Sequence, residues 1–238
     1  MKYGTLYGIG VGPGDPDLIT LKAVKVLGRV AVVFASASTK NRYSLSVDIV
    51  SPHLKKDIPL IRLDFPMTRD RAVLQSAWER NAVKVKNVLE TGQDAALLTL
   101  GDPMTYSTFG YLMRTLKASV PDIPIEVIPG ITSYQAGCAS SHQVLAEGEE
   151  SFTVVSGALG AGKLKQVIEH TDNVVMIKVY RNYKEIMETL HHLDLISKAV
   201  LVSRCGLDGQ EIISNLKDQP GVTPPYLSHL IIKKNHSS

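Results

Sequence analysis

Three short segments rich in glycine, proline and hydroxyl residues each follow an apolar run that predicts a buried strand. They are Gly10–Pro16 (GVGPGDP), Gly101–Ser107 (GDPMTYS) and Pro129–Ser133 (PGITS). Glycine permits sharp turns and close approach of a ligand to the backbone, and aspartate and hydroxyl side chains cap backbone N–H groups. Ligands of open α/β sheets bind beyond the carboxyl ends of the strands. We therefore expect the three segments to form one composite pocket for a nucleotide-like ligand.

The first segment departs from the two familiar fingerprints of nucleotide sites. It lacks the G-x-x-x-x-G-K-[S/T] pattern that cradles phosphates, and Pro13 interrupts the glycine spacing of a dinucleotide site. No single acidic residue at the end of a second strand stands out as a ribose partner. These departures weigh against an oxidoreductase that uses a dinucleotide. A tight turn without a ligand remains the alternative for this segment taken alone.

The elements that must position these segments follow from hydrophobic periodicity. The first half predicts an α/β domain, and Trp78 on the apolar stripe of one helix is interpreted as a core residue. Its strands are expected at 5–9, 30–35, 58–63, 95–100 and 122–128, with helices at 70–89 and 108–118 and a polar loop at 36–46. The second half predicts strands at 152–156, 174–179, 199–203, 209–214 and 227–232 and helices at 164–170 and 183–193.

The second half predicts another α/β domain, with antiparallel pairs, because the last two strands have no helix-length segment between them. We expect these two strands to pair directly. The boundary is placed near Val120, which divides the chain into domains at 1–120 and 121–238.

Composition narrows the class of protein. Of the 238 residues 44% are hydrophobic, enough for a core, and the two cysteines suggest a reducing cytoplasm rather than a disulfide framework or a metal cluster. No signal peptide or membrane-length apolar run is evident, and a net charge of +3 is too small to indicate nucleic acid. Residues 40–71 contain seven basic and four acidic side chains. This stretch is either a solvated face or a site for an anionic small molecule.

Taken together with the pattern Leu18-x-Thr20-x-Lys22-Ala23, the three segments resemble the tetrapyrrole methylase family, in the right order and over nearly the whole chain. Within that family, residues 63–68 (LDFPMT) and 101–111 look most like the C20-methyltransferases of precorrin-2 or cobalt-factor II. The resemblance implies a class III methyltransferase: two α/β domains with S-adenosylmethionine in the cleft between them. The first domain would form a trough for the tetrapyrrole and the second would complete the cofactor site. It also implies a homodimer with a role in cobalamin biosynthesis.

The resemblance also implies roles for particular residues. The residues expected at the cofactor are Pro13, Gly101, Asp102, Met104, Thr105, Tyr106, Thr132, Ser133, Val179, Tyr180, Cys205 and Tyr226. Basic side chains of the charged stretch would anchor the carboxylates of the tetrapyrrole, namely Lys40, Arg42, Arg62, Arg69 and Arg71.

Methyl transfer from a sulfonium mainly requires alignment of donor and acceptor, so no nucleophilic triad is expected. Asp102 and Tyr106 are the candidates for removing a proton from C20, with water as an alternative. Asp102 could instead cap its own turn. Tyr106 could instead form a wall of the trough or pack in the core. The protein has no evident metal-ligand cluster, so any cobalt would arrive with the substrate.

Several alternatives remain open from the sequence. Other tetrapyrrole methylases act at C11 or C17 or on uroporphyrinogen III, and a protein or RNA methylase could share the architecture. A ligand-binding module without catalysis is a third class.

Overall fold

The computed structural model describes residues 2–37, 44–218 and 223–234. Its contacts divide the chain into two compact units, one that ends at Thr132 and one that begins at Ser133. This boundary lies later in the chain than the position near Val120 that the sequence suggested. The reason is that the strand Ile125–Ile128 pairs with the first strand and so belongs to the first unit. We call the two parts the N-terminal and the C-terminal unit.

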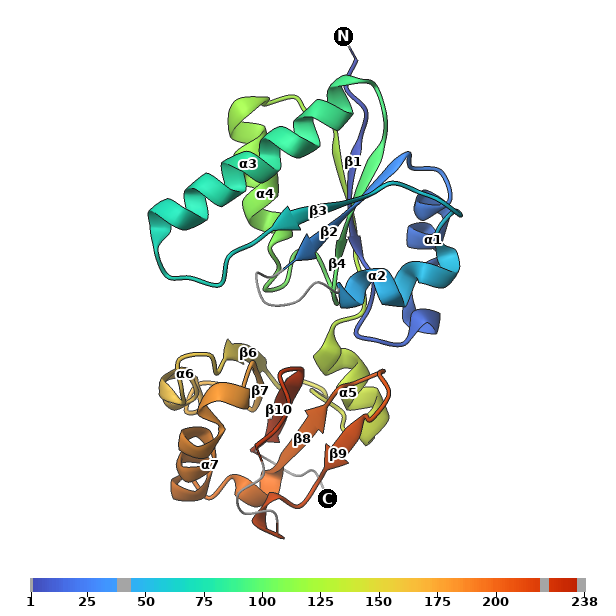
Figure 1. Cartoon of the computed structure of the whole chain (residues 1–238). Coiled ribbons are helices and arrows are strands. Elements are labelled where there is room, and N and C mark those ends of the chain that lie inside the picture. Colours follow the sequence, from blue (N-terminus) through green and yellow to red (C-terminus); the bar gives the residue numbers. More distant parts are fainter. Residues whose placement is uncertain (1, 38–43, 219–222, 235–238) are drawn as a thin grey trace. The chain divides into compact units, whose positions relative to one another are not determined.

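The N-terminal unit is built on a five-stranded sheet in which all neighbours are parallel (Figure 1). The strand order is β3-β2-β4-β1-β5. The strands are β1 (Leu6–Gly10), β2 (Val32–Ala37), β3 (Leu60–Asp64), β4 (Ala95–Thr99) and β5 (Ile125–Ile128). A parallel sheet is covered on both faces, which explains why its central strands are apolar without alternation.

Helices cover both faces of this sheet. Helices α1 (Leu21–Leu27) and α2 (Leu45–Val50) lie on one face, and α3 (Arg71–Glu90) and α4 (Phe109–Ser119) lie on the other (Figure 1). Successive residues of β1 serve the two layers, since Leu6 packs in the core with α3 and α4 and Tyr7 in the core with α1 and α2. The two layers hold β1 in the middle of the unit, between β4 and β5.

The C-terminal unit has a mixed sheet with the order β6-β7-β10-β8-β9, in which only the β6–β7 pair is parallel. The strands are β6 (Phe152–Ser156), β7 (Asn173–Ile177), β8 (Ala199–Ser203), β9 (Glu211–Ile213) and β10 (Ser228–Lys233). Its helices are α5 (Ser133–Ser141), α6 (Gly162–Val167) and α7 (Tyr183–His192). The predicted α/β class with antiparallel pairs in the second half is confirmed.

The direct pairing expected between the last two strands is wrong. Strand β9 pairs with β8, and β10 lies between β7 and β8. All six residues of β10 are buried, whereas the short β9 is partly exposed. Burial of its apolar side chains therefore places β10 at the centre of the sheet and β9 at the edge.

The predicted strands and helices are all present, with ends shifted by a few residues. Helix α5 was not expected, and α2 begins at Leu45, inside the segment interpreted as a loop. Pro16–Leu18 form a single 3-10 turn, in which Asp15 Oδ1 accepts a hydrogen bond from Asp17 N (2.8 Å). Helix α1 follows and is capped by the side chain of Thr20. Among the described residues, no helix is long and apolar enough to cross a membrane.

Candidate functional site

The loops that follow β1 and β4 are joined directly by backbone hydrogen bonds. Gly101 N donates to Gly12 O (2.7 Å) and Gly12 N donates to Gly101 O (3.3 Å), which forms a small antiparallel bridge. Both residues have positive φ angles, 85° at Gly12 and 68° at Gly101, a conformation that glycine adopts without strain. These positive φ angles explain why both positions are glycine.

The loop after β5 approaches the same place through two further glycines. A Cβ atom on Gly10 would lie 2.5 Å from Gly130 N and 2.6 Å from Gly101 O. A Cβ on Gly130 would overlap the same carbonyl oxygen. These neighbours are backbone atoms that cannot rotate away. The three loops can therefore converge only because Gly10 and Gly130 have no side chains, while Gly101 contributes its carbonyl oxygen and its positive φ. We call this contact the glycine junction.

Asp102 ties the second and third loops together. Its Oδ1 accepts hydrogen bonds from Met104 N (2.8 Å) and Thr105 Oγ1 (3.3 Å), and its Oδ2 accepts one from Gly130 N (3.1 Å). The carboxylate thus caps its own turn and also reaches the loop after β5. Both carboxylate oxygens are in use, so Asp102 holds the loop after β4 against the loop after β5.

The remaining expected residues of the N-terminal unit lie around the glycine junction. Pro13 and Thr132 are buried, and a Cβ on Gly101 would stand 3.9 Å from Thr132 Cα. Met104 and Tyr106 are more than half exposed on the loop after β4. Tyr106 has a φ of 51°, a region in which residues other than glycine are strained. Such strain is often found at ligand sites, where the surrounding structure enforces it.

The residues expected in the C-terminal unit gather at one edge of its sheet. Val179 and Tyr180 follow β7, Cys205 follows β8, and Tyr226 precedes β10. Because β10 runs antiparallel to both neighbours, its beginning lies beside the ends of β7 and β8. The rings of Tyr180 and Tyr226 meet edge to face with centroids 5.1 Å apart. The structure therefore brings these four residues to a common edge.

Two details define this edge further. Arg204 N donates a hydrogen bond to Leu227 O (2.7 Å), which joins the segment after β8 to the segment before β10. Lys178 and Arg204, each directly after the end of a strand region, have φ angles of 59° and 52°. Cys205 is buried, and this burial raises the pKa of its thiol. A neutral buried thiol suits packing better than nucleophilic chemistry.

The basic residues expected at the substrate are only partly described. Lys40 and Arg42 lie outside the described residues. Arg62 lies on β3, Arg69 precedes α3, and Arg71 is the first residue of α3. All three are exposed, and no described carboxylate forms an ion pair with Arg69 or Arg71. Two cations near the start of α3 are thus available to an anionic ligand.

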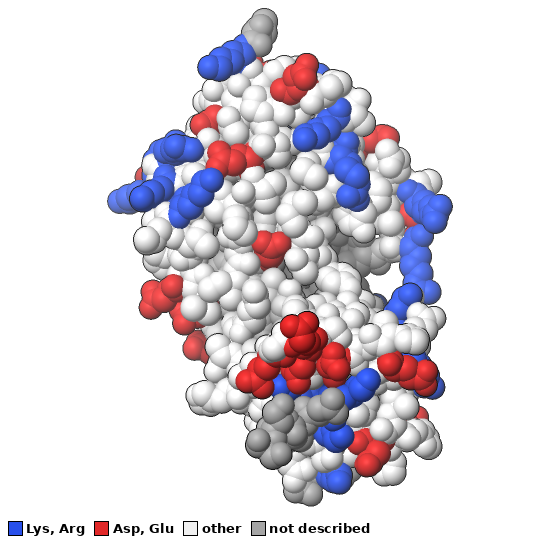
Figure 2. Space-filling view, turned by 180° about the vertical axis from the view of Figure 1, so that it is seen from behind, with Lys and Arg blue, Asp and Glu red and all other residues white. Residues whose placement is uncertain are grey.

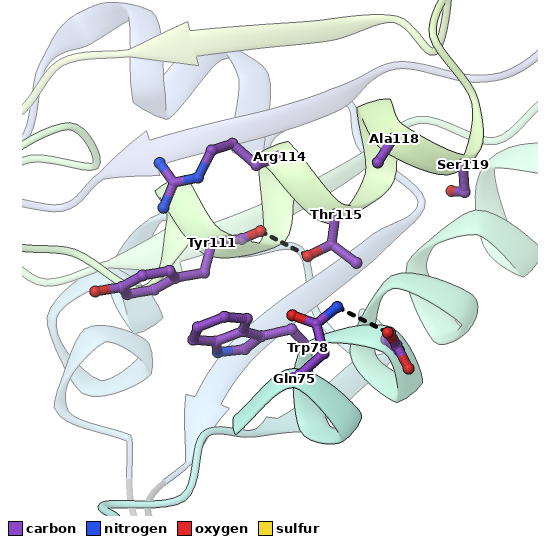
Figure 3. A pocket seen from close by; sticks show the side chains of 8 residues that line it. Gln75, Trp78, Tyr111, Arg114, Thr115, Ala118 and Ser119 are labelled. Carbon is purple, nitrogen blue, oxygen red and sulfur yellow. Dashed lines mark hydrogen bonds between the residues drawn. The ribbon is translucent and has the colours of Figure 1, made fainter. Parts of the chain in front are cut away.

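A pocket of about 500 Å³ lies elsewhere in the N-terminal unit, between α3 and α4 (Figure 3). The rings of Trp78 and Tyr111 are stacked there, with centroids 4.5 Å apart and an interplanar angle of 6°, and the Arg114 guanidinium lies 5.1 Å from the Tyr111 centroid. Trp78, predicted to be core, is half-buried: it packs on the core and also lines this pocket. None of the residues expected at the cofactor or the substrate lines it.

The described residues contain no group of three or more His, Cys, Asp or Glu side chains placed to hold a metal ion. What the sequence did not reveal is how the three loops are joined, namely the Gly12–Gly101 bridge and the bond from Gly130 to Asp102. The sequence did contain a turn signal at each of these places, in the Gly101-Asp102 dipeptide and in Pro129-Gly130. It could not identify the partners, because these bonds join residues 28 and more positions apart.

The chain is similar to known proteins over most of its length. The family described as Tetrapyrrole (Corrin/Porphyrin) Methylases matches residues 5–219. A cobalt-precorrin-2 C(20)-methyltransferase of Salmonella typhimurium is 31% identical, and the match covers 97% of each chain. A probable cobalt-precorrin-2 C(20)-methyltransferase of Methanocaldococcus jannaschii is 33% identical, with 96% of each chain covered.

The fold has a counterpart among solved structures. A uroporphyrin-III C-methyl transferase of Thermus thermophilus, complexed with S-adenyl homocysteine, superposes with a TM-score of 0.66 at 20% identity. The match covers 96% of this chain and 97% of that chain. At this identity the likeness establishes the fold.

Proposed function

Because the chain belongs to the tetrapyrrole (corrin/porphyrin) methylase family, we propose that it methylates C20 of precorrin-2 or cobalt-factor II with S-adenosylmethionine, a step of cobalamin biosynthesis. The single observation that carries this proposal is the similarity, over nearly the full length, to two C20-methyltransferases. The converging loops of the N-terminal unit supply a site suited to the reaction. Both described cysteines are free, in keeping with the cytoplasmic location that we propose.

The residues around the glycine junction fit the methionine part of the cofactor. We assign the backbone of Gly101 and the loop from Met104 to Tyr106 to this part, and the hydroxyls of Thr132 and Ser133 to its carboxylate end. Pro13 would border both cofactor and substrate. The C-terminal unit would supply the contacts to adenine and ribose through Val179, Tyr180, Cys205 and Tyr226. Hydroxyls, backbone amides and aromatic edges suit a zwitterion joined to a nucleoside.

The reaction depends more on the alignment of the methyl donor with the acceptor carbon than on a strong acid or base. When bound, the cofactor would supply a methyl group activated by its sulfonium, and the C–S electron pair would stay on sulfur as the methyl is transferred to the electron-rich carbon. Holding two reacting groups in line contributes roughly 7–11 kcal/mol to such a step. The glycine junction and Asp102 give the N-terminal loops the rigidity that this alignment needs. We therefore propose that Asp102 is a positioning residue and that Tyr106 forms a wall of the substrate site.

The substrate is a polycarboxylate, and the cations near β3 and α3 match it. Arg62, Arg69 and Arg71 would anchor its carboxylates, together with Lys40 and Arg42. Guanidinium groups bind carboxylates through two parallel hydrogen bonds, which fixes orientation as well as affinity. The proton released from C20 would pass to water.

Methylation at another position of a tetrapyrrole is the second candidate, and the fold shared with a uroporphyrin-III methylase favours it. An RNA substrate is disfavoured, because an RNA-binding protein needs a dense basic surface. On the face in Figure 2, the Lys and Arg side chains form several separate groups with uncharged surface between them.

One assay tests the proposal. The protein is incubated with S-adenosylmethionine and either precorrin-2 or cobalt-factor II, and the product is analysed by mass and by the position of the new methyl group. We expect one added methyl at C20 with one of the two rings. A methyl at C11, C17 or a uroporphyrinogen position supports the second candidate, and no transfer to any of these rings contradicts both. We also propose a homodimer, which light scattering tests by molar mass.

A further inference from the structure

Helix α5 packs on β8 and β10 through residues with small side chains. Gly137 is buried in the middle of this helix, and a Cβ atom placed there would overlap Nε2 of His229 and lie 2.9 Å from its Cε1. His229 is on β10, paired with Val202 of β8 and Ile177 of β7. The imidazole thus occupies the space that any larger residue at position 137 would need. We call this contact the His229–Gly137 seat.

His229 is an unusual residue for a central strand. Its side chain is 3% exposed, and its Nε2 has no hydrogen-bond partner among the described residues. A buried polar atom without a partner lowers stability, so an aliphatic residue would serve the core better. Burial also lowers the pKa of His229 to about 4, which keeps the ring neutral at physiological pH. Because the buried imidazole lowers stability, we look for its role in how its ring fits against Gly137.

The same helix face carries further contacts toward the proposed cofactor residues. Ser133 and Gly137 are four positions apart and so lie on one face of α5, about 6 Å apart along its axis. One turn beyond Gly137, the Ser140 hydroxyl donates a hydrogen bond to the thiol of Cys205, which lowers the pKa that burial raises. Ser133 and Cys205 are both assigned to the cofactor under the proposed function. The seat lies between their two points of attachment on α5.

We propose that His229 is a positioning residue whose contact with Gly137 sets the height of α5 above the sheet, and thereby the distance between Ser133 and Cys205 at the cofactor. The two close-fitting partners act as a spacer, since a packed ring against a bare backbone allows little movement in either direction. A larger residue at 137 lifts the helix, and a smaller one at 229 lets it sink. This inference rests on the proposed use of S-adenosylmethionine, and it adds residues to which no contact with the cofactor is assigned.

The first experiment measures cofactor binding to the full chain by calorimetry for Gly137→Ala and for a matched control, Gly162→Ala. Gly162 lies in the same unit, and a Cβ there would meet no atom within 4 Å. We expect Gly137→Ala to raise the Kd for S-adenosylmethionine about tenfold or more, whereas Gly162→Ala leaves it within about twofold. In steady-state assays the KM for S-adenosylmethionine should rise and the KM for the tetrapyrrole should not.

The second experiment combines the change with His229→Ala, which removes the ring without adding bulk. His229→Ala alone should raise the Kd for the cofactor about threefold to tenfold, and it also covers the case in which Gly137→Ala fails to fold. On the His229→Ala background, the further change Gly137→Ala should alter the Kd by less than about twofold, because its obstacle is gone. Additive effects of the two changes would contradict the spacer.

The outcomes separate this inference from the proposed function. If the unaltered protein binds S-adenosylmethionine and both variants bind it equally well, the seat is only structural and the inference is wrong. A lower melting temperature with unchanged Kd has the same meaning. If the unaltered protein does not bind S-adenosylmethionine, the proposed function is wrong, and the inference, which depends on it, is wrong as well.

Discussion

The two sheets gather their proposed site residues at an edge in different ways. In the N-terminal unit, three neighbouring parallel strands end side by side. The loops after β1, β4 and β5 therefore start next to one another. In the C-terminal unit, the residues come from the ends of β7 and β8 and from the beginning of the antiparallel β10. We call the ends of β1, β4 and β5 the parallel edge and the ends of β7 and β8 with the beginning of β10 the mixed edge. At the parallel edge the contacts described above are mainly between backbone atoms, and at the mixed edge they include the contact between the rings of Tyr180 and Tyr226. The first should tolerate substitution much less than the second.

The largest effect is expected for Gly10→Ala at the parallel edge. The new Cβ would stand 2.5 Å from Gly130 N, and overpacking against atoms that cannot rotate should lower the free energy of unfolding by about 3 kcal/mol or more. Urea denaturation measures this loss. The matched control is Gly110→Ala, where the nearest atom would be the flexible Arg114 Nη1 at 3.5 Å. Equal stability of the two variants would contradict the close approach of the backbones at Gly10 and Gly130.

The next effect concerns the core of the mixed sheet. Because the pKa of His229 falls from 6.5 to about 4 on folding, the folded protein binds fewer protons than the unfolded chain between these pH values. The free energy of unfolding should therefore decrease as pH falls from 6.5 to 4, by up to about 3 kcal/mol from this residue. Denaturation at several pH values tests this. His229→Ala should flatten the slope, and His191→Ala, at an exposed histidine, should leave it unchanged.

Asp102→Asn tests the link between the loops of the parallel edge. The amide would keep an acceptor for Met104 N but place N–H groups opposite Gly130 N, so one hydrogen bond is lost and two donors face each other. A cost of about 1–3 kcal/mol corresponds to roughly a 5–150-fold rise in the KM for S-adenosylmethionine. The pH profile of kcat should keep its shape. A profile that loses its acidic limb would instead identify Asp102 as the proton acceptor, because a base is active only when deprotonated.

Arg69→Gln tests the anionic substrate at the start of α3. Loss of one charge-assisted contact at an exposed position should raise the KM for the tetrapyrrole about 3–10-fold and leave the KM for S-adenosylmethionine nearly unchanged. Arg114→Gln is the control, since Arg114 is an exposed arginine of the pocket between α3 and α4, where no substrate contact is proposed. Equal effects on the two substrates would contradict the assignment of Arg69.

The smallest effect is expected at the mixed edge. Tyr226→Ala removes the edge-to-face partner of Tyr180, an interaction of about 0.5–1.5 kcal/mol. The Kd for S-adenosylmethionine should rise about 2–10-fold, with little change in melting temperature because Tyr226 is 57% exposed. Calorimetry measures both. A loss of affinity larger than that of Asp102→Asn would reverse the proposed order of the two edges.

The parts of the fold that depend on neighbours in sequence were predictable. Apolar runs such as Ala95–Thr99 and the stripe of Arg71–Glu90 identified their elements, because burial and periodicity leave a local signal. The turn after β1 was predictable for the same reason, since glycine and proline restrict the backbone where they stand. Helix α5 was missed because its residues, SYQAGCASS, carry no apolar stripe. It is held by close packing on β8 and β10, which periodicity cannot reveal.

The sequence alone determined the chemical kind of the proposed site, which has glycine-rich ends of strands, hydroxyl residues and a stretch of excess positive charge. It did so because turns, caps and charges act over a few residues. Only the tertiary structure decided that Asp102 reaches Gly130, that β10 lies between β7 and β8, and that Gly137 receives His229. These contacts join residues far apart in the chain. Their partners are chosen by which backbones can approach and which side chains fill the remaining space, and that choice exists only once the elements have packed.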